Sequence, residues 1–151
     1  MKLYDRLVSQ TNIFSPGEDV ETKSDCYVFG RASFNTLLVR GNLGVQGVLS
    51  VKELILHGHL MTNFEIRADK ITAWGTPTTW LVGSRIDGRS VTFSEKKIKI
   101  SCKAFTVDQW ARMTDTRLSV WSNDGVVWLN KNREALLNAH KALVEFHKKG
   151  I

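Results

Sequence analysis

Pairs of mostly apolar residues two positions apart recur at regular intervals between Leu37 and Ala73. A spacing of two places both members of a pair on one face of a β-strand. The pairs are Leu37/Val39, Leu43/Val45, Leu49/Val51, Leu54/Leu56, Leu60/Thr62 and Ile71/Ala73. Leu37, Leu54 and Ile71 lie 17 residues apart, with room for three short strands in each interval. This period predicts a three-sided β-solenoid, in which the inward pairs of one turn, or rung, stack on those of the next.

The same period extends in both directions. Backward it reaches Val20/Thr22, Cys26/Val28 and Ala32/Phe34. Forward, three extra residues at Thr-Pro-Thr-Thr (76–79) precede Trp80/Val82, Ile86, Val91/Phe93, Ile98/Ile100 and Phe105/Val107. We therefore predict a mainly β protein with a single-stranded β-helix over residues 20–107. A β-sandwich is the alternative, because short strands separated by turns also build sandwiches.

Residues 1–19 are predicted to be an N-terminal lead-in, in which Leu3, Leu7 and Val8 line one short helical face. A terminal amphipathic segment can touch a membrane surface, so peripheral membrane contact is kept as an alternative. Asp5 beside Arg6 gives this segment no basic polar face, however. Packing over the end of the domain is therefore the main expectation.

Residues 108–151 are predicted to cover the other end of the solenoid. The Asn-Asp-Gly sequence at 123–125 is a strong turn signal and predicts a β-hairpin. Apolar residues at steps of 3 and 4 over 131–149 predict a C-terminal amphipathic α-helix. The solenoid, the hairpin and the helix would together form one compact domain.

Composition restricts the classes of protein to consider. No run of 18 apolar residues is present and the N-terminus lacks the apolar run of a secretory signal, so we expect a cytoplasmic protein. The formal net charge is +6, and residues 37–107 hold ten Lys or Arg against five Asp or Glu. Basic faces can attract nucleic acid, but outward strand positions also need charges for solubility. Nucleic acid is therefore not an expected partner.

No arrangement of residues indicates catalysis, a metal or a cofactor. Cys26 and Cys102 fall at or beside inward positions several turns apart, and no CxxC or HExxH spacing exists. His57 and His59 flank Gly58 and are interpreted as corner residues. We therefore expect a non-enzymatic protein without cofactor, metal or small-molecule substrate.

Six residues form a candidate binding or assembly surface: Trp110, Trp121, Trp128, Arg67, Arg85 and Arg89. Tryptophan has an apolar body and a polar N–H, which suits it to sugars, bases or a partner protein. The same bulk suits it to sealing the open end of a solenoid, which is the competing interpretation.

The run Val39-Arg-Gly-Asn-Leu-Gly-Val-Gln-Gly, followed by residues 48–66, resembles the bactofilins, which are polymer-forming bacterial cytoskeletal proteins. The resemblance covers residues 36–107. It implies a right-handed β-helix of triangular rungs and a structural role in self-association, without nucleotide and beside the membrane. Bactofilins polymerise through exposed terminal rungs, whereas this chain carries a C-terminal hairpin and helix. If these cover the last rung, the sequence favours a closed oligomer over a filament.

Two other function classes remain open. Steps of 6 residues also occur in left-handed β-helix acyltransferases, in which His57 or His59 would be the base. Such repeats run at 6-6-6 with isolated aliphatic residues, unlike the paired residues here. A carbohydrate- or nucleic-acid-binding module is the third reading, with Trp74, Trp80 and basic outward residues as the surface.

Overall fold

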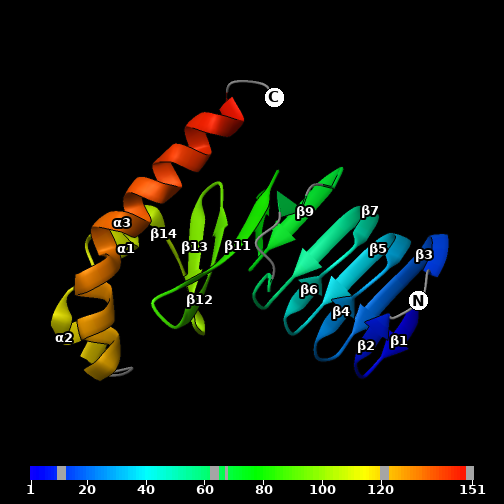
Figure 1. The fold of residues 1–151 in the computed structure, drawn as a ribbon, viewed down its shortest axis with the longest axis horizontal. Helices are drawn as coiled ribbons and strands as arrows, with labels where there is room; N and C mark the ends of the chain where they lie inside the picture. Colours follow the sequence, from blue (N-terminus) through cyan, green and yellow to red (C-terminus); the bar gives the residue numbers. More distant parts are fainter. Residues whose placement is uncertain (10–12, 62–64, 67, 120–122, 149–151) are drawn as a thin grey trace.

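The computed structural model describes residues 1–9, 13–61, 65–66, 68–119 and 123–148. In chain order they form a parallel β-solenoid of about three turns, an antiparallel meander and three helices (Figure 1). The predicted solenoid and C-terminal helix are therefore confirmed. None of the helices described combines the length and the apolar content needed to cross a membrane.

Two parallel sheets build the sides of the solenoid. The first contains β1 (Lys2–Tyr4), β3 (Ile13–Thr22), β5 (Arg31–Val39), β7 (Val48–Leu56) and β9 (Lys70–Ala73) in that order, and ends with the antiparallel β10 (Thr76–Thr78). The second contains β2 (Leu7–Ser9), β4 (Cys26–Val28) and β6 (Leu43–Val45). Strands β5 and β7 each run across two of the predicted short strands, whereas β3 contains one, Val20/Thr22, and extends back into the predicted lead-in.

The register of the sheets matches the predicted period. Val20 pairs with Leu37, Leu37 with Leu54, and Leu54 with Ile71. All four side chains are at most 1% exposed. Each fully buried aliphatic side chain contributes about 1.5–3 kcal/mol relative to an exposed one. This continuous aliphatic column is the main source of stability for the solenoid.

One corner of the solenoid is held by a ladder of side chains 17 residues apart. Asp25 Oδ1 accepts a hydrogen bond from Asn42 N at 2.8 Å, and Asn42 Oδ1 accepts one from His59 N at 2.8 Å. The turns approach closely here, because a Cβ placed on Gly58 would collide with the carbonyl oxygen of Gly41. The requirement for glycine therefore comes from close approach of the backbones.

The N-terminal segment is part of the solenoid, and the prediction of a separate lead-in with a short helical face was wrong. Strand β1 pairs in parallel with β3, and β2 with β4, with Leu7 opposite Cys26. The period was hidden because a register shift between Ser15 and Asp19 adds residues to β3. Lys2 also takes the position opposite Val20, where the later rungs have an apolar residue.

Beyond Ala73 the strands are antiparallel, so the predicted solenoid ends earlier than residue 107. The solenoid is followed by the antiparallel meander, which consists of β11 (Leu81–Ile86), β12 (Arg89–Ser94), β13 (Lys97–Ile100) and β14 (Lys103–Thr106). The short strand β8 (Glu65–Ile66) pairs with β11 at the edge of this sheet. The chain reverses at Trp74-Gly75 (φ 53° and 77°) and at Asp87-Gly88 (φ 46° and 82°). Positive φ at both central residues is typical of tight hairpin turns. Alternation alone could not distinguish the two directions, because strands of either kind bury every second residue.

The described part of the C-terminal segment forms three helices and no strand, so the hairpin predicted at residues 123–125 was wrong. The helices are α1 (Val107–Ala111), α2 (Asp115–Ser119) and α3 (Asn123–Lys148). Trp128, Leu129, Asn132 and Leu136 extend the helical spacing toward the N-terminus, and all four are buried. Burial of this face outweighs the local turn preference of Asn-Asp-Gly, since tertiary packing routinely overrides propensity.

A second apolar core joins the meander to the helices. It contains Trp80, Val91, Phe93, Ile98, Trp110, Leu118, Trp128 and Leu129, among others. The first core fills the solenoid. Helix α3 and strands β1 and β2 lie at opposite ends of the molecule (Figure 1). The helices therefore pack on the meander, while the first rung of the solenoid lies away from them.

Candidate functional site

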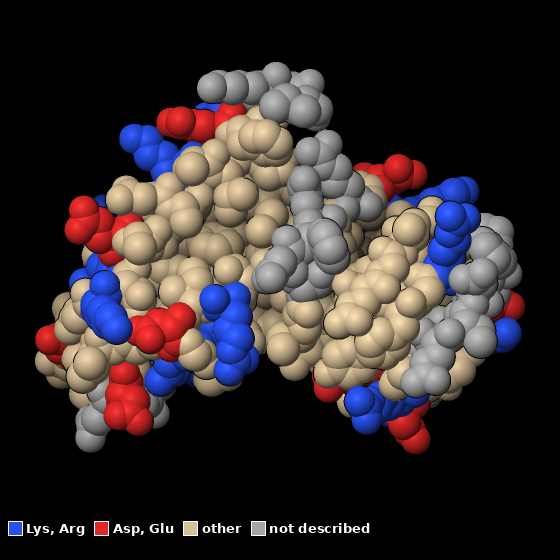
Figure 2. Space-filling view, viewed as in Figure 1, with Lys and Arg blue, Asp and Glu red and all other residues tan. Residues whose placement is uncertain are grey.

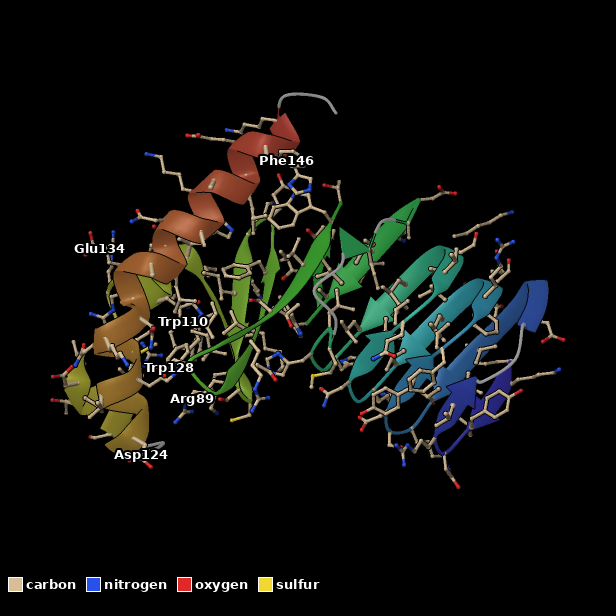
Figure 3. All side chains as sticks on the ribbon, viewed as in Figure 1. Arg89, Trp110, Asp124, Trp128, Glu134 and Phe146 are labelled. Atoms are coloured by element: carbon tan, nitrogen blue, oxygen red, sulfur yellow. The ribbon has the colours of Figure 1, made fainter. Side chains whose placement is uncertain are left out.

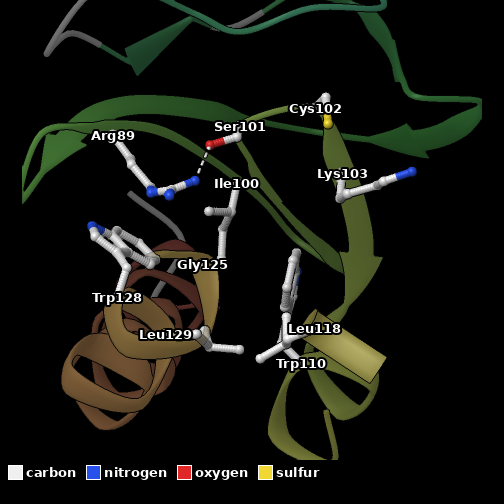
Figure 4. A pocket seen from close by; sticks show the side chains of 10 residues that line it. All are labelled: Arg89, Ile100, Ser101, Cys102, Lys103, Trp110, Leu118, Gly125, Trp128 and Leu129. Atoms are coloured by element: carbon white, nitrogen blue, oxygen red, sulfur yellow. Dashed lines mark hydrogen bonds between the residues drawn. The ribbon is translucent and has the colours of Figure 1, made fainter. Parts of the chain in front are cut away.

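Three of the six predicted surface residues line one cavity, which we call the Trp–Arg cavity (Figure 4). Arg89 comes from the start of β12, Trp110 from α1 and Trp128 from α3. The volume is about 120 Å³. The other residues lining the cavity are Ile100, Ser101, Cys102, Lys103, Leu118, Gly125 and Leu129. Most of this wall is apolar, and none of the described residues that line it carries a carboxylate.

Both tryptophans of the cavity are fixed by their indole N–H groups. Trp110 Nε1 donates to the Ile98 carbonyl at 2.7 Å, and Trp128 Nε1 donates to the Asp87 carbonyl at 2.9 Å. Phe105 packs edge-on against the Trp110 ring, with 5.1 Å between ring centroids. Buried Trp N–H groups normally find such partners. The polar group of each indole is therefore occupied by backbone, and the cavity is left with aromatic carbon.

Arg89 places a positive charge beside this aromatic wall. Its Nη1 donates to Ser101 Oγ at 3.1 Å, and its guanidinium carbon lies 5.8 Å from the Trp128 ring centroid. Stacking on an aromatic ring favours a guanidinium over an ammonium group. Within the described ranges Arg89 has no carboxylate in ion-pair contact. Its charge is thus held in place without being neutralised.

The remaining predicted surface residues do not join this site. Arg85 is exposed on β11 and does not line the cavity. Arg67 and Trp121 lie outside the described residues. In Figure 3, Arg89, Trp110 and Trp128 lie close together, while Phe146 lies near the far end of α3. Figure 2 shows Lys and Arg interspersed with Asp and Glu on this face, and no single basic patch.

His59, a corner residue as predicted, is buried between the solenoid and the meander. Its Nδ1 lies 3.0 Å from Thr92 Oγ1, and its Nε2 contacts the Ser101 carbonyl. The Thr92 hydroxyl also accepts a hydrogen bond from Leu60 N at 3.1 Å. Burial lowers the pKa of His59, despite the opposing effect of the Ser101 carbonyl. Both ring nitrogens are engaged in the protein, which gives His59 a structural role.

Two further histidines, His140 and His147, lie on the side of α3 that faces the meander. His140 Nε2 lies 2.9 Å from the Ser94 carbonyl oxygen. The His147 ring stacks on Trp80, with 4.3 Å between centroids and 7° between planes. Both residues therefore pack α3 against the meander.

A second candidate site is the outer edge of β1 and β2, which we call the first-rung edge. These strands pair with β3 and β4 on one side, and no strand of the described chain pairs with their other side. Large apolar side chains are exposed here, namely Met1 (76%), Leu3 (54%), Tyr4 (37%) and Val8 (42%). In the sequence, Leu7 was the residue that could have indicated this rung, because it pairs with Cys26. The interval between these two residues is longer than the repeat of the later rungs, so the pairing was not recognised.

Among the described residues, no three His, Cys, Asp or Glu side chains group so as to hold a metal ion. The sequence matches no protein-family model, and neither a curated protein nor a solved structure matches the chain.

Proposed function

We propose that this protein is a non-enzymatic assembly protein, a cytoplasmic scaffold element of bactofilin-like type. In this proposal two copies of the chain associate through their first-rung edges. The observation that carries it is the combination of an open strand edge with exposed apolar side chains on the same two strands (Leu3, Tyr4 and Val8) and on the adjacent Met1.

An open edge of a parallel sheet is a template for another strand. Its unpaired N–H and C=O groups can accept a new strand, and proteins normally protect such edges with proline, charges or a covering element. Strand β1 contains one charged residue, Lys2, whose ammonium pairs with Glu18 Oε1 at 3.1 Å. Leu3 and Tyr4 leave the rest of this short edge apolar.

The opposite edge of the same sheet is protected. It ends with β10, whose middle residue is Pro77. Proline has no N–H to donate and is the residue that blocks edge pairing. Thr78 is also tied to the meander, since its Oγ1 accepts a hydrogen bond from Glu95 N at 3.2 Å. Growth of the sheet is therefore favoured at one end only.

Because only the first-rung edge of the described sheet can accept another strand, association should stop once two copies have paired through it. A two-fold axis through the first-rung edge would place β1 antiparallel to β1 of the second copy and continue the sheet across the interface. Each copy would then present its protected end outward. The expected product is a dimer, in contrast to the filaments that the family resemblance implies.

The test is the solution mass of the purified protein, measured by light scattering after gel filtration over a range of concentrations. We expect a dimer at high concentration that dissociates on dilution. Leu3→Lys combined with Val8→Lys places two charges on each edge and should give a monomer that keeps the wild-type circular dichroism spectrum. Val48→Lys is the matched control, because Val48 is 56% exposed on β7. A monomer at all concentrations, or filaments, would contradict the proposal.

A further inference from the structure

The Trp–Arg cavity has the size and wall of a site for one aromatic ring. Cavities of roughly 150 Å³ lined by Leu, Ile and Phe stay dry and bind benzene. This cavity measures about 120 Å³ and is lined by Ile100, Leu118 and Leu129 together with two tryptophans. A small apolar group can enter without losing hydrogen bonds to the wall.

The fixed indoles exclude ligands that need many polar contacts. Trp110 and Trp128 have donated their N–H groups to the carbonyls of Ile98 and Asp87. Sugars rely on hydrogen bonds to most of their hydroxyl groups, and an unpaired buried hydroxyl is costly. The chemistry of the wall therefore favours an aromatic or aliphatic body over a carbohydrate.

Arg89 supplies the polar end of the site. Figure 4 shows its side chain extending beside Trp128 toward Ser101, while the Lys103 side chain points away from it. A guanidinium group carries five N–H donors in a planar fork that matches the two oxygens of a carboxylate. The bond to Ser101 Oγ uses Nη1 and fixes the direction of the fork. None of the described lining residues is acidic, so no negative charge on this wall opposes an anion.

We propose that this cavity binds a small aromatic carboxylate, with the ring against Trp110, Trp128 and Leu129 and the carboxylate on Arg89. The site is independent of the first-rung edge, which lies on the solenoid. Self-association and ligand binding can therefore succeed or fail separately.

Benzoate is the probe, and binding is followed by calorimetry and by the indole N–H resonances of Trp110 and Trp128. A ligand of about nine non-hydrogen atoms should bind in the millimolar range or tighter. Benzyl alcohol keeps the ring without the charge, and inorganic phosphate keeps a charge without the ring. Each should bind at least about tenfold more weakly than benzoate.

Two variants separate the parts of the site. Arg89→Gln removes the charge from a half-exposed position and should weaken benzoate binding about tenfold or more, with little change for benzyl alcohol. Arg85→Gln is the matched control on the same meander and should bind as the wild type does. No resonance shift with benzoate, equal binding of phosphate or benzyl alcohol, or equal losses in both variants would overturn the assignment.

Discussion

His59 Nδ1 lies 3.0 Å from the hydroxyl oxygen of Thr92, and this contact joins the last turn of the solenoid to the meander. The Thr92 hydroxyl accepts from Leu60 N and donates to His59, whose Nε2–H then donates to the Ser101 carbonyl. This assignment requires a neutral imidazole protonated on Nε2. The two halves of the fold are therefore connected by a buried polar chain as well as by apolar contact.

Acid should loosen this connection. Burial lowers the pKa of His59 in the folded protein, whereas the unfolded chain keeps the ordinary value near 6.5. The unfolded state then binds the proton first, so stability is complete above about pH 6.5 and falls as the pH drops through 6.5 toward the folded pKa. Urea unfolding at about pH 8 and pH 5 should show this loss, and His59→Gln should reduce the difference between the two values. His57→Gln, at an exposed position, is the control and should show the same loss of stability between about pH 8 and pH 5 as the wild type. If His59→Gln also showed the full wild-type loss, the proposed role of His59 in the pH dependence would be contradicted.

The aliphatic column should not accept a charge. Leu56 is fully buried on β7 between Val39 and Ala73, so Leu56→Lys would bury an unpaired ammonium group. We expect loss of more than about 4 kcal/mol of unfolding free energy, enough to abolish cooperative thermal unfolding. Ile55→Lys, at the adjacent and less buried position, should retain a cooperative transition. A cooperative Leu56→Lys protein would show that the column is not the main core.

The close approach of the corners should be sensitive to one methyl group. Gly58→Ala would push a Cβ into the Gly41 carbonyl, and we expect destabilisation of about 1–3 kcal/mol. Gly17→Ala introduces a Cβ with no atom within 4 Å and is the control. The comparison is made by chemical denaturation, and equal midpoints for the two variants would contradict the described packing.

The sequence predicted the parts of the fold that follow from a repeated interval. Val20, Leu37, Leu54 and Ile71 stack as their spacing indicates, because one inward residue per rung fixes the register. The alternation of buried and exposed residues after Ala73 does not indicate whether the strands are parallel or antiparallel. In the sequence, only the turn-forming pair Asp87-Gly88 indicated that two of these strands are antiparallel. The helix across residues 123–125 depends on the burial of Trp128, Leu129 and Leu136, which outweighs the local turn preference of Asn-Asp-Gly.

The candidate sites were predicted less completely. Arg89, Trp110 and Trp128 were selected by residue type. Their position around one cavity depends on the packing of α1 and α3 against the meander. Leu118 and Leu129 complete the wall and carry no chemical signal of their own. The first-rung edge was missed because β1 and β2 depart from the apolar pattern of the later rungs.

Cross-linking at the first-rung edge tests the proposed pairing most directly. Leu3 is the middle residue of β1, so an antiparallel pair centred on this strand would place the two copies of Leu3 opposite each other. The background is Cys102→Ser, since Cys102 is exposed, while burial raises the pKa of Cys26 to about 12 and makes it unreactive. On mild oxidation, Leu3→Cys should form a disulfide-linked dimer, whereas Val48→Cys should form no covalent dimer. Equal cross-linking of both variants, or of neither, would contradict assembly through the first rung.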